Sequence, residues 1–188
     1  PGNPSSSHKR GIFLNKVLCY SKKIFSKILN CENNEIFFTS GATESNNIAI
    51  LGYVRSLPKN SEIITISTEH ASVIEPFKEL QKEGYKCIFA PVNKYGELEM
   101  QTLKALISKQ TKFISISIVN NEIGTIQNIK KISELCKKHN IILHTDATQA
   151  FCKMNLNVKD INVDMLTAAS HKSHSIPGTG LLYIAQNI

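Results

Sequence analysis

Residues 112–121 read KFISISIVNN, a run in which only serine interrupts the apolar residues until the two asparagines. Its β-branched and aromatic residues predict a strand, and a second run, IITI at residues 63–66, has the same character. Such apolar strands are typical of a sheet that is covered on both faces, because neither face has to meet water. We therefore expect a buried sheet with helices on either side.

Segments with helical spacing of apolar residues alternate with these strands along the chain. The predicted helices are residues 13–29, 43–57, 71–83, 101–108 and 130–139. The predicted strands are residues 35–39, 62–67, 86–91, 112–119, 141–145, 163–167 and 181–184. This alternation predicts an α/β fold of three αβα layers around a mostly parallel sheet, and 188 residues are enough for one core.

The formal net charge of +7 comes from lysines that are scattered along the chain. Only Arg10 and Arg55 could offer a planar guanidinium to a phosphate backbone, and basic residues are not interleaved with aromatic ones. We therefore do not expect nucleic-acid binding. An anionic substrate or cofactor would be attracted by the same positive field.

The cysteines are five in number and widely spaced, which favours reduced thiols and a cytoplasmic location over a disulfide framework. No run of about 18 apolar residues and no signal peptide is present, so we expect no membrane association. A zinc site would have to be assembled from Cys136, His139, His144 and Cys152. Their spacing is poor for zinc, and Cys136 falls on the apolar face of a predicted helix, so we expect no metal.

Polar residues gather in the loops that follow the carboxyl ends of five predicted strands. The turns at the opposite ends look like ordinary surface turns. Ligands of open parallel sheets bind beyond the carboxyl ends of the strands, so we expect one site there. Its loops are Gly41–Thr43, Thr68–His70, Asn120–Gly124, Asp146–Gln149 and Ser170–Lys172.

Lys172 and Asp146 are the two most informative residues of this predicted site. A partly desolvated lysine can lose its proton and form a Schiff base, and a buried carboxylate can keep a heterocyclic nitrogen protonated. Pyridoxal phosphate requires both groups. Taken singly, however, a strand-end aspartate is more often a helix cap, and most lysines are simply surface residues.

The other loops offer supporting chemistry. Gly41, Ala42 and Thr43 open a helix, whose free N–H groups and dipole could hold a phosphate, although the threonine could equally be a simple cap. His70 could stack on an aromatic cofactor and move protons, or it could cap a helix. The remaining two candidates, Asn121 and Gln149, could bond to a ring oxygen or only satisfy the backbone.

Six motifs, in order along the chain, resemble those of the cysteine desulfurases, which are pyridoxal phosphate enzymes of fold type I and of the aminotransferase class V group. They are residues 2–6 (GNPSS), 41–47 (GATESNN), 68–70 (TEH), 119–124 (VNNEIG), 144–149 (HTDATQ) and 171–172 (HK). The resemblance implies the large, cofactor-binding domain of that fold. It also implies a sulfurtransferase that converts L-cysteine to L-alanine.

By this resemblance Lys172 and His70 would be catalytic, with Lys172 as the Schiff-base lysine and His70 as the stacking and proton-transfer residue. Asp146 would bind the pyridine nitrogen. Gln149 and Asn121 would contact the ring hydroxyl and the substrate side. The phosphate would be held by Ala42, Thr43 and His171, with Ser170 compensating for Ala169, where the family has a phosphate-binding serine. The sulfur would pass through an enzyme persulfide to an acceptor protein, such as an iron–sulfur scaffold, or to thionucleosides, and the enzyme would be a homodimer.

The family carries its persulfide cysteine and its substrate-binding arginine well beyond the lysine, whereas this chain extends only 16 residues past Lys172. We therefore expect residues 1–188 to be an incomplete large domain without the small domain, and inactive in isolation. The loop at residues 175–180 also differs, with its proline shifted by one position. Two alternatives stay open: a selenocysteine lyase or other class V lyase, and a truncated non-catalytic copy.

Overall fold

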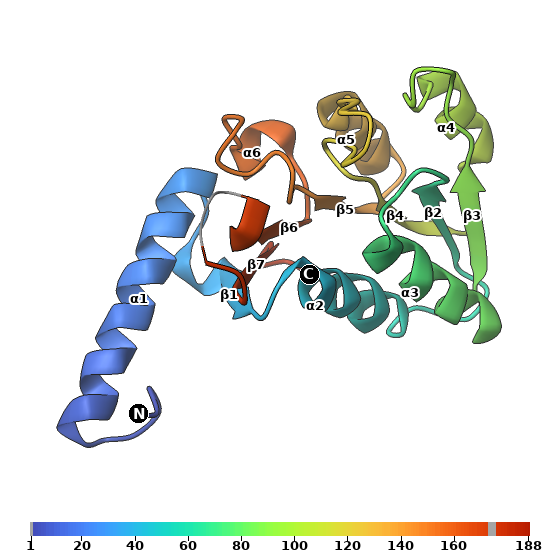
Figure 1. Cartoon of the computed structure of the whole chain (residues 1–188). Helices are drawn as coiled ribbons and strands as arrows, with labels where there is room; N and C mark the ends of the chain where they lie inside the picture. Colours follow the sequence, from blue (N-terminus) through green and yellow to red (C-terminus); the bar gives the residue numbers. More distant parts are fainter. Residues whose placement is uncertain (1, 173–175) are drawn as a thin grey trace.

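The computed structural model describes residues 2–172 and 176–188. It confirms the three-layer α/β fold and the mostly parallel sheet (Figure 1). The helices are α1 (Lys9–Leu29), α2 (Ala42–Asn47), α3 (Ala71–Lys82), α4 (Met100–Leu106), α5 (Ile129–Lys138) and α6 (Val158–Ile161). The strands are β1 (Ile36–Thr39), β2 (Glu62–Ile66), β3 (Lys86–Ala90), β4 (Thr111–Ser115), β5 (Ile142–Asp146), β6 (Met165–Ala169) and β7 (Gly180–Ile184).

The seven strands form one sheet in the order β1-β7-β6-β5-β4-β2-β3. Strands β3, β2, β4, β5 and β6 are parallel to one another. Strand β7 is antiparallel to both of its neighbours, β6 and β1. Since β1 is antiparallel to β7, it runs in the same direction as β6. The carboxyl ends of all strands except β7 therefore lie at one edge of the sheet.

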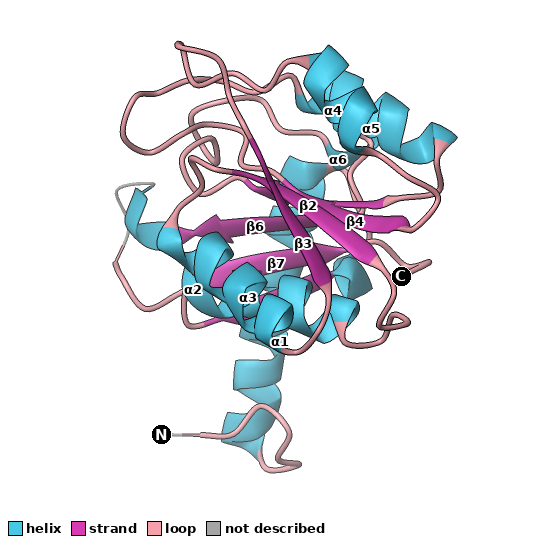
Figure 2. Ribbon diagram, turned by 90° about the vertical axis from the view of Figure 1, so that its right-hand side faces the viewer, coloured by secondary structure: helices cyan, strands magenta, loops and turns pink. Residues whose placement is uncertain are grey.

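Helices cover both faces of the sheet, as Figure 2 shows. On one face, α3 and the residues after α2 pack over the buried Ile63 and Phe113. On the other face, α4, α5 and α6 pack over Ile64, Ile114 and Leu143. Neighbouring residues of β2 and of β4 thus enter opposite cores, which explains why the runs at 63–66 and 113–116 carry so few polar residues.

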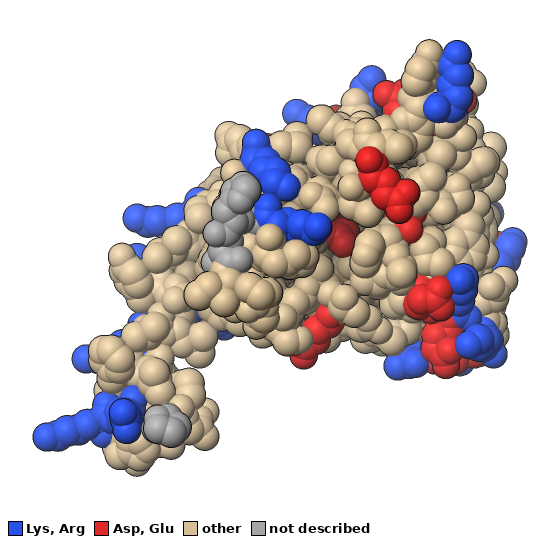
Figure 3. Space-filling view, in the orientation of Figure 1, with Lys and Arg blue, Asp and Glu red and all other residues tan. Residues whose placement is uncertain are grey.

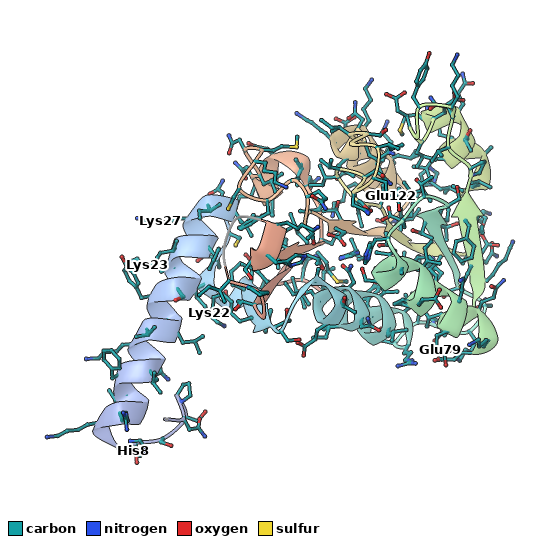
Figure 4. All side chains as sticks on the ribbon, viewed as in Figure 1. His8, Lys22, Lys23, Lys27, Glu79 and Glu122 are labelled. Atoms are coloured by element: carbon teal, nitrogen blue, oxygen red, sulfur yellow. The ribbon has the colours of Figure 1, made fainter. Side chains whose placement is uncertain are left out.

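Helix α1 extends away from the body of the molecule and contacts it only near its carboxyl end (Figure 1). There Phe25 packs edge to face on Phe38 of β1, and Leu29 is fully buried. Lys22, Lys23 and Lys27 project from this end of the helix (Figure 4). On the face drawn in Figure 3, basic side chains are spread over several elements. In the described residues, no helix combines the length and the apolar character needed to cross a bilayer.

Most element boundaries differ from the predicted ones by a few residues, and three differences are larger or of another kind. The helix predicted at 43–57 contains a π-helical turn, Ile48–Gly52, and the short helix α6 was not predicted. Strand β4 ends at Ser115 rather than at residue 119. Beyond Ser115 the chain still bonds to β5, through the N–H groups of Ile116 and Ile118, but it no longer pairs with the backbone of β2.

Candidate active site

A cavity of about 300 Å³ lies at the carboxyl edge of the sheet, which is a suitable size for a small ligand. Side chains from all five of the predicted loops line it. Eight of the nine residues predicted to bind a cofactor are among them: Ala42, Thr43, His70, Asn121, Asp146, Gln149, His171 and Lys172. The remaining lining residues are Ser40, Gly41, Ser72, Ser117, Val119 and Thr148.

Asp146, the last residue of β5, is 8% exposed. Its Oδ2 accepts a 2.8 Å hydrogen bond from Nδ2 of Asn46, and its Oδ1 accepts a 2.8 Å bond from the backbone N–H of Thr148. Two donors thus fix the carboxylate at the cavity wall. The second of these bonds is a local turn contact, so Asp146 organises its own loop as well as facing the cavity.

His70 both caps α3 and lines the cavity, so the two interpretations of this residue are compatible. Its Nδ1 accepts a 3.1 Å hydrogen bond from the backbone N–H of Ser72 and lies 2.8 Å from the Ser72 hydroxyl. Because Nδ1 is an acceptor, this network assigns the ring proton of the neutral imidazole to Nε2.

A chain of hydrogen bonds joins His70 to Asp146. Nδ2 of Asn46 donates to the Ser72 hydroxyl at 2.9 Å and to Asp146 at 2.8 Å, while the Ser72 hydroxyl can donate to His70. Asn46 and Ser72 are buried, at 0% and 7% exposed. The proposed ring-stacking residue and the proposed partner of the ring nitrogen are therefore held in one network.

The start of α2 forms another wall. Gly41 is extended, with open space where a Cβ would lie, and the first turn of a helix leaves N–H groups without intrahelical partners. The carboxylate of Glu44 accepts bonds from the N–H and the hydroxyl of Ser40, at 2.6 and 2.7 Å, which fixes the turn before the helix. Thr43 is exposed and also lines the cavity.

His171 and Lys172 lie in a 3₁₀ turn that directly follows β6, and both are exposed at the cavity. The structure places Ser170, the ninth predicted residue, outside this cavity. Its hydroxyl donates to the carbonyl of Ile176 at 2.6 Å, and it lines a separate apolar hollow together with Phe25 and Phe38. Residues 173–175, including the start of the altered loop, lie outside the described residues.

Sequence reasoning missed several residues that line the cavity or lie directly behind its wall. Asn46 and Ser72 make the network described above, Ser117 faces the cavity from beyond β4, and the buried Thr148 hydroxyl has no partner among the described residues. Asn46 stood in the GATESNN motif, one helical turn after the cavity-lining Ala42 and Thr43. That spacing was the signal that could have found it.

His144, one residue of the zinc alternative, is completely buried between β4 and β6. Its ring nitrogens lie 2.8 Å from the Ser115 hydroxyl and 3.1 Å from the Thr167 hydroxyl, and its ring stacks on Phe113. Burial lowers its pKa, so the ring is neutral. In the part of the chain that the structure describes, no three potential metal ligands of the His, Cys, Asp and Glu types come together.

The family model for the aminotransferase class-V proteins matches residues 1–188. The chain belongs to this family. It is 41% identical, over all of its 188 residues, to the cysteine desulfurase IscS of Clostridium botulinum, of which it covers 47%. The chain thus spans about half the length of the curated relatives it matches.

Two solved structures share the fold of this class-V chain. One, described as a NifS-like protein, superposes with a TM-score of 0.96 at 34% identity, over 100% of this chain and 52% of the other. The second, described as SspA in complex with cysteine, has a TM-score of 0.92 at 36% identity and covers 97% of this chain and 53% of that one. Both similarities extend over essentially all of this class-V chain.

Proposed function

We propose that this chain is the cofactor-binding large domain of a cysteine desulfurase that depends on pyridoxal 5'-phosphate. The observation that carries the proposal is the convergence of Lys172, Asp146 and His70, from three separate loops, on one cavity. The class-V family and the relatives named as cysteine desulfurases support it. A small domain would be supplied by sequence outside residues 1–188.

The donors and acceptors of the cavity fit this cofactor. Asp146 offers a fixed, buried carboxylate to a protonated ring nitrogen. The hydroxyl of Thr148, two residues further on, has no partner among the residues that the structure describes. Bound through Lys172, pyridoxal phosphate would act as an electron sink that makes the α-proton of an amino acid acidic. A phosphate would meet the N–H groups of Ala42 and Thr43, the Thr43 hydroxyl and His171.

The side chains of the chain itself would position this chemistry. His70, with its proton on Nε2 and its Nδ1 held by Ser72, would lie over the ring and keep its orientation. Gln149 and Asn121 would bond to the ring hydroxyl and to the substrate side. After the α-proton is lost, the Lys172 amine would carry it, since an exposed lysine can reach into the cavity.

The proposed reaction takes L-cysteine to L-alanine and leaves the sulfur on a protein thiol. Within the described residues, no cysteine lines the cavity, and burial raises the pKa of Cys31, Cys87 and Cys136. Raised pKa values make these three thiols poor nucleophiles. The accepting thiolate and a guanidinium for the substrate carboxylate would come from outside this chain, so the isolated 188 residues should release no alanine.

The proposed partners are L-cysteine, a second copy of the chain in a homodimer, and a sulfur-acceptor protein such as an iron–sulfur scaffold. SspA was solved in complex with cysteine, which supports cysteine as the substrate. The cytoplasmic location stays a prediction.

The test uses the full-length protein with pyridoxal phosphate. With L-cysteine and a reducing thiol, we expect alanine and sulfide in equal amounts. Cofactor binding without either product, or a strong preference for selenocysteine, would contradict the proposed activity. Absence of cofactor binding by the full-length protein would contradict the cofactor assignment as well.

A further inference from the structure

Glu69 is a buried carboxylate behind the cavity wall, and the mechanism above gives it no role. It lies in the turn between β2 and α3, is 9% exposed, and does not line the cavity itself. Its neighbour in the chain, His70, does line the cavity. Burying a carboxylate is unfavourable, so a stabilising contact or a function is expected for Glu69.

The carboxylate of Glu69 accepts a hydrogen bond that, within the sheet, a backbone carbonyl of the neighbouring strand would accept. Beyond Ser115 the chain no longer pairs with β2, and the N–H of Ser117 instead donates to Oε1 of Glu69 at 2.7 Å. The Ser117 hydroxyl donates to Oε2 of the same carboxylate. Both oxygens of Glu69 are thus occupied by one residue, and that residue lines the cavity.

The same contact joins two loops of the site. The loop with Glu69 carries His70, and the segment with Ser117 continues to Asn121. A second bond between these loops, from Nδ2 of Asn120 to the carbonyl of Thr68 at 2.8 Å, lies beside the first. The wall that carries His70 is therefore fixed to the wall that carries Asn121 chiefly through polar contacts.

A carboxylate is an unfavourable choice for a purely structural brace at this point. Desolvation, and the negative charge of Asp146 nearby, raise the pKa of Glu69 to about 7, while the bonds from Ser117 and from the His70 N–H oppose the shift. An uncharged side chain would avoid that penalty. A carboxylate, however, can accept from the N–H and the hydroxyl of Ser117 at once, whereas an amide has only one acceptor oxygen.

We propose that Glu69 is a positioning residue of this site, whose carboxylate clamps Ser117 and thereby holds His70 in place to stack on the bound cofactor. The inference rests on the proposed function, since it assigns Glu69 to the same pyridoxal phosphate site. Glu69 contacts neither the cofactor nor the substrate. It acts through Ser117 and through the backbone of His70.

The first measurement examines the clamp in the cofactor-free protein. The backbone amide proton of Ser117 should shift with pH as Glu69 ionises, and Glu69→Gln should abolish that transition in an NMR titration. Glu134→Gln, which alters an exposed carboxylate on α5, is the matched control and should leave the transition in place. A Ser117 amide that titrates identically in wild type and Glu69→Gln would overturn the clamp.

The second measurement is the dissociation constant for pyridoxal phosphate, taken from absorbance titrations of the full-length protein. Glu69→Gln and Ser117→Ala should each weaken binding by roughly tenfold or more, as for other residues that orient a ligand-binding group. The double variant should lose no more than the worse single variant, because both changes break one contact. Ser117→Ala removes only a hydroxyl, so this variant still tests the proposal if Glu69→Gln folds poorly.

The outcomes separate this inference from the proposed function. Wild-type protein that binds the cofactor while both variants bind equally well would overturn the role of Glu69 and leave the proposed function standing. Fully additive losses in the double variant would also overturn it. Wild-type protein that does not bind pyridoxal phosphate would overturn the proposed function, and the positioning role with it.

Discussion

The side-chain amide of Asn46 donates a 2.8 Å hydrogen bond to the carboxylate of Asp146, across 100 residues of sequence. Asn46 belongs to α2, after β1, and Asp146 ends β5. The helix that could receive a phosphate is thereby connected directly to the carboxylate that could receive a ring nitrogen. One asparagine sets the relation between the two ends of the proposed cofactor site.

Asn46→Ala should weaken pyridoxal phosphate binding and reduce stability by about 1 to 3 kcal/mol, since it removes the side-chain donor to Oδ2 of Asp146 and to the Ser72 hydroxyl. Absorbance titration and urea denaturation would measure the two effects. Asn60→Ala, in an exposed turn before β2, is the control and should change neither. Wild-type affinity in Asn46→Ala would show that Asp146 is oriented without it.

Lys172→Ala should remove the covalent link to the cofactor. We expect wild type treated with pyridoxal phosphate and then borohydride to carry the added mass on the peptide that contains Lys172. Lys104→Ala changes an exposed lysine of α4 and should keep both the label and the visible absorption. A label that persists in Lys172→Ala at wild-type level would place the link on another amine.

Glu69 should make the apo protein less stable as the pH rises. The pKa of Glu69 is about 7 in the folded chain, whereas the ordinary value for a glutamate, taken here for the unfolded chain, is 4.5. Between pH 4.5 and pH 7 the folded chain therefore binds this proton more tightly than the unfolded chain does. The stabilisation is full below about pH 4.5 and is lost as the pH rises through about 7, by roughly 2 to 4 kcal/mol. Glu69→Gln does not titrate, so the unfolding free energy of the variant minus that of wild type should become more positive between pH 5 and pH 8. A constant difference, in urea denaturation at several pH values, would refute the assignment.

Gly180→Ala should damage both the sheet and the phosphate side of the cavity. An added Cβ would overlap the Thr39 hydroxyl and would lie 2.6 Å from the backbone of Gly41. We expect a loss of about 1 to 3 kcal/mol in thermal or urea unfolding, together with weaker cofactor binding. Gly52→Ala meets nothing within 4 Å, so it should be neutral or slightly stabilising. Equal stability of the two variants would contradict this close approach.

The layers and the polar loops could be predicted from local pattern, because apolar runs and Gly-rich breaks are local properties. Lys172, Asp146 and His70 were placed at one edge of the sheet by the rule that parallel strands end together. The end of β4 was not predictable. The N–H of Ser117, which could have bonded to the backbone of β2, instead bonds to the side chain of Glu69, which is far away in sequence.

The strand order was also beyond local pattern. Nothing in the run at 181–184 indicates that β7 is antiparallel and lies between β1 and β6. The bond from Asn46 to Asp146 could not be predicted for the same reason: the helical spacing places Asn46 on the side of the site, but no local pattern names its partner 100 residues away. Ser170 had a plausible motif position, but its hydroxyl bonds to Ile176 instead of facing the cavity.

The insertion of β7 between β1 and β6 has a consequence for biosynthesis. Among the described strands, β1 pairs with β7 alone, and β7 is the last of them to be made. While a ribosome is still translating residues before 180, β1 has no described strand with which to pair, although α2, which follows the Gly41 turn, can already pack on β6. The strand that leads into the Gly41 turn of the cavity therefore gains its sheet pairing only after the last described strand has emerged from the exit tunnel.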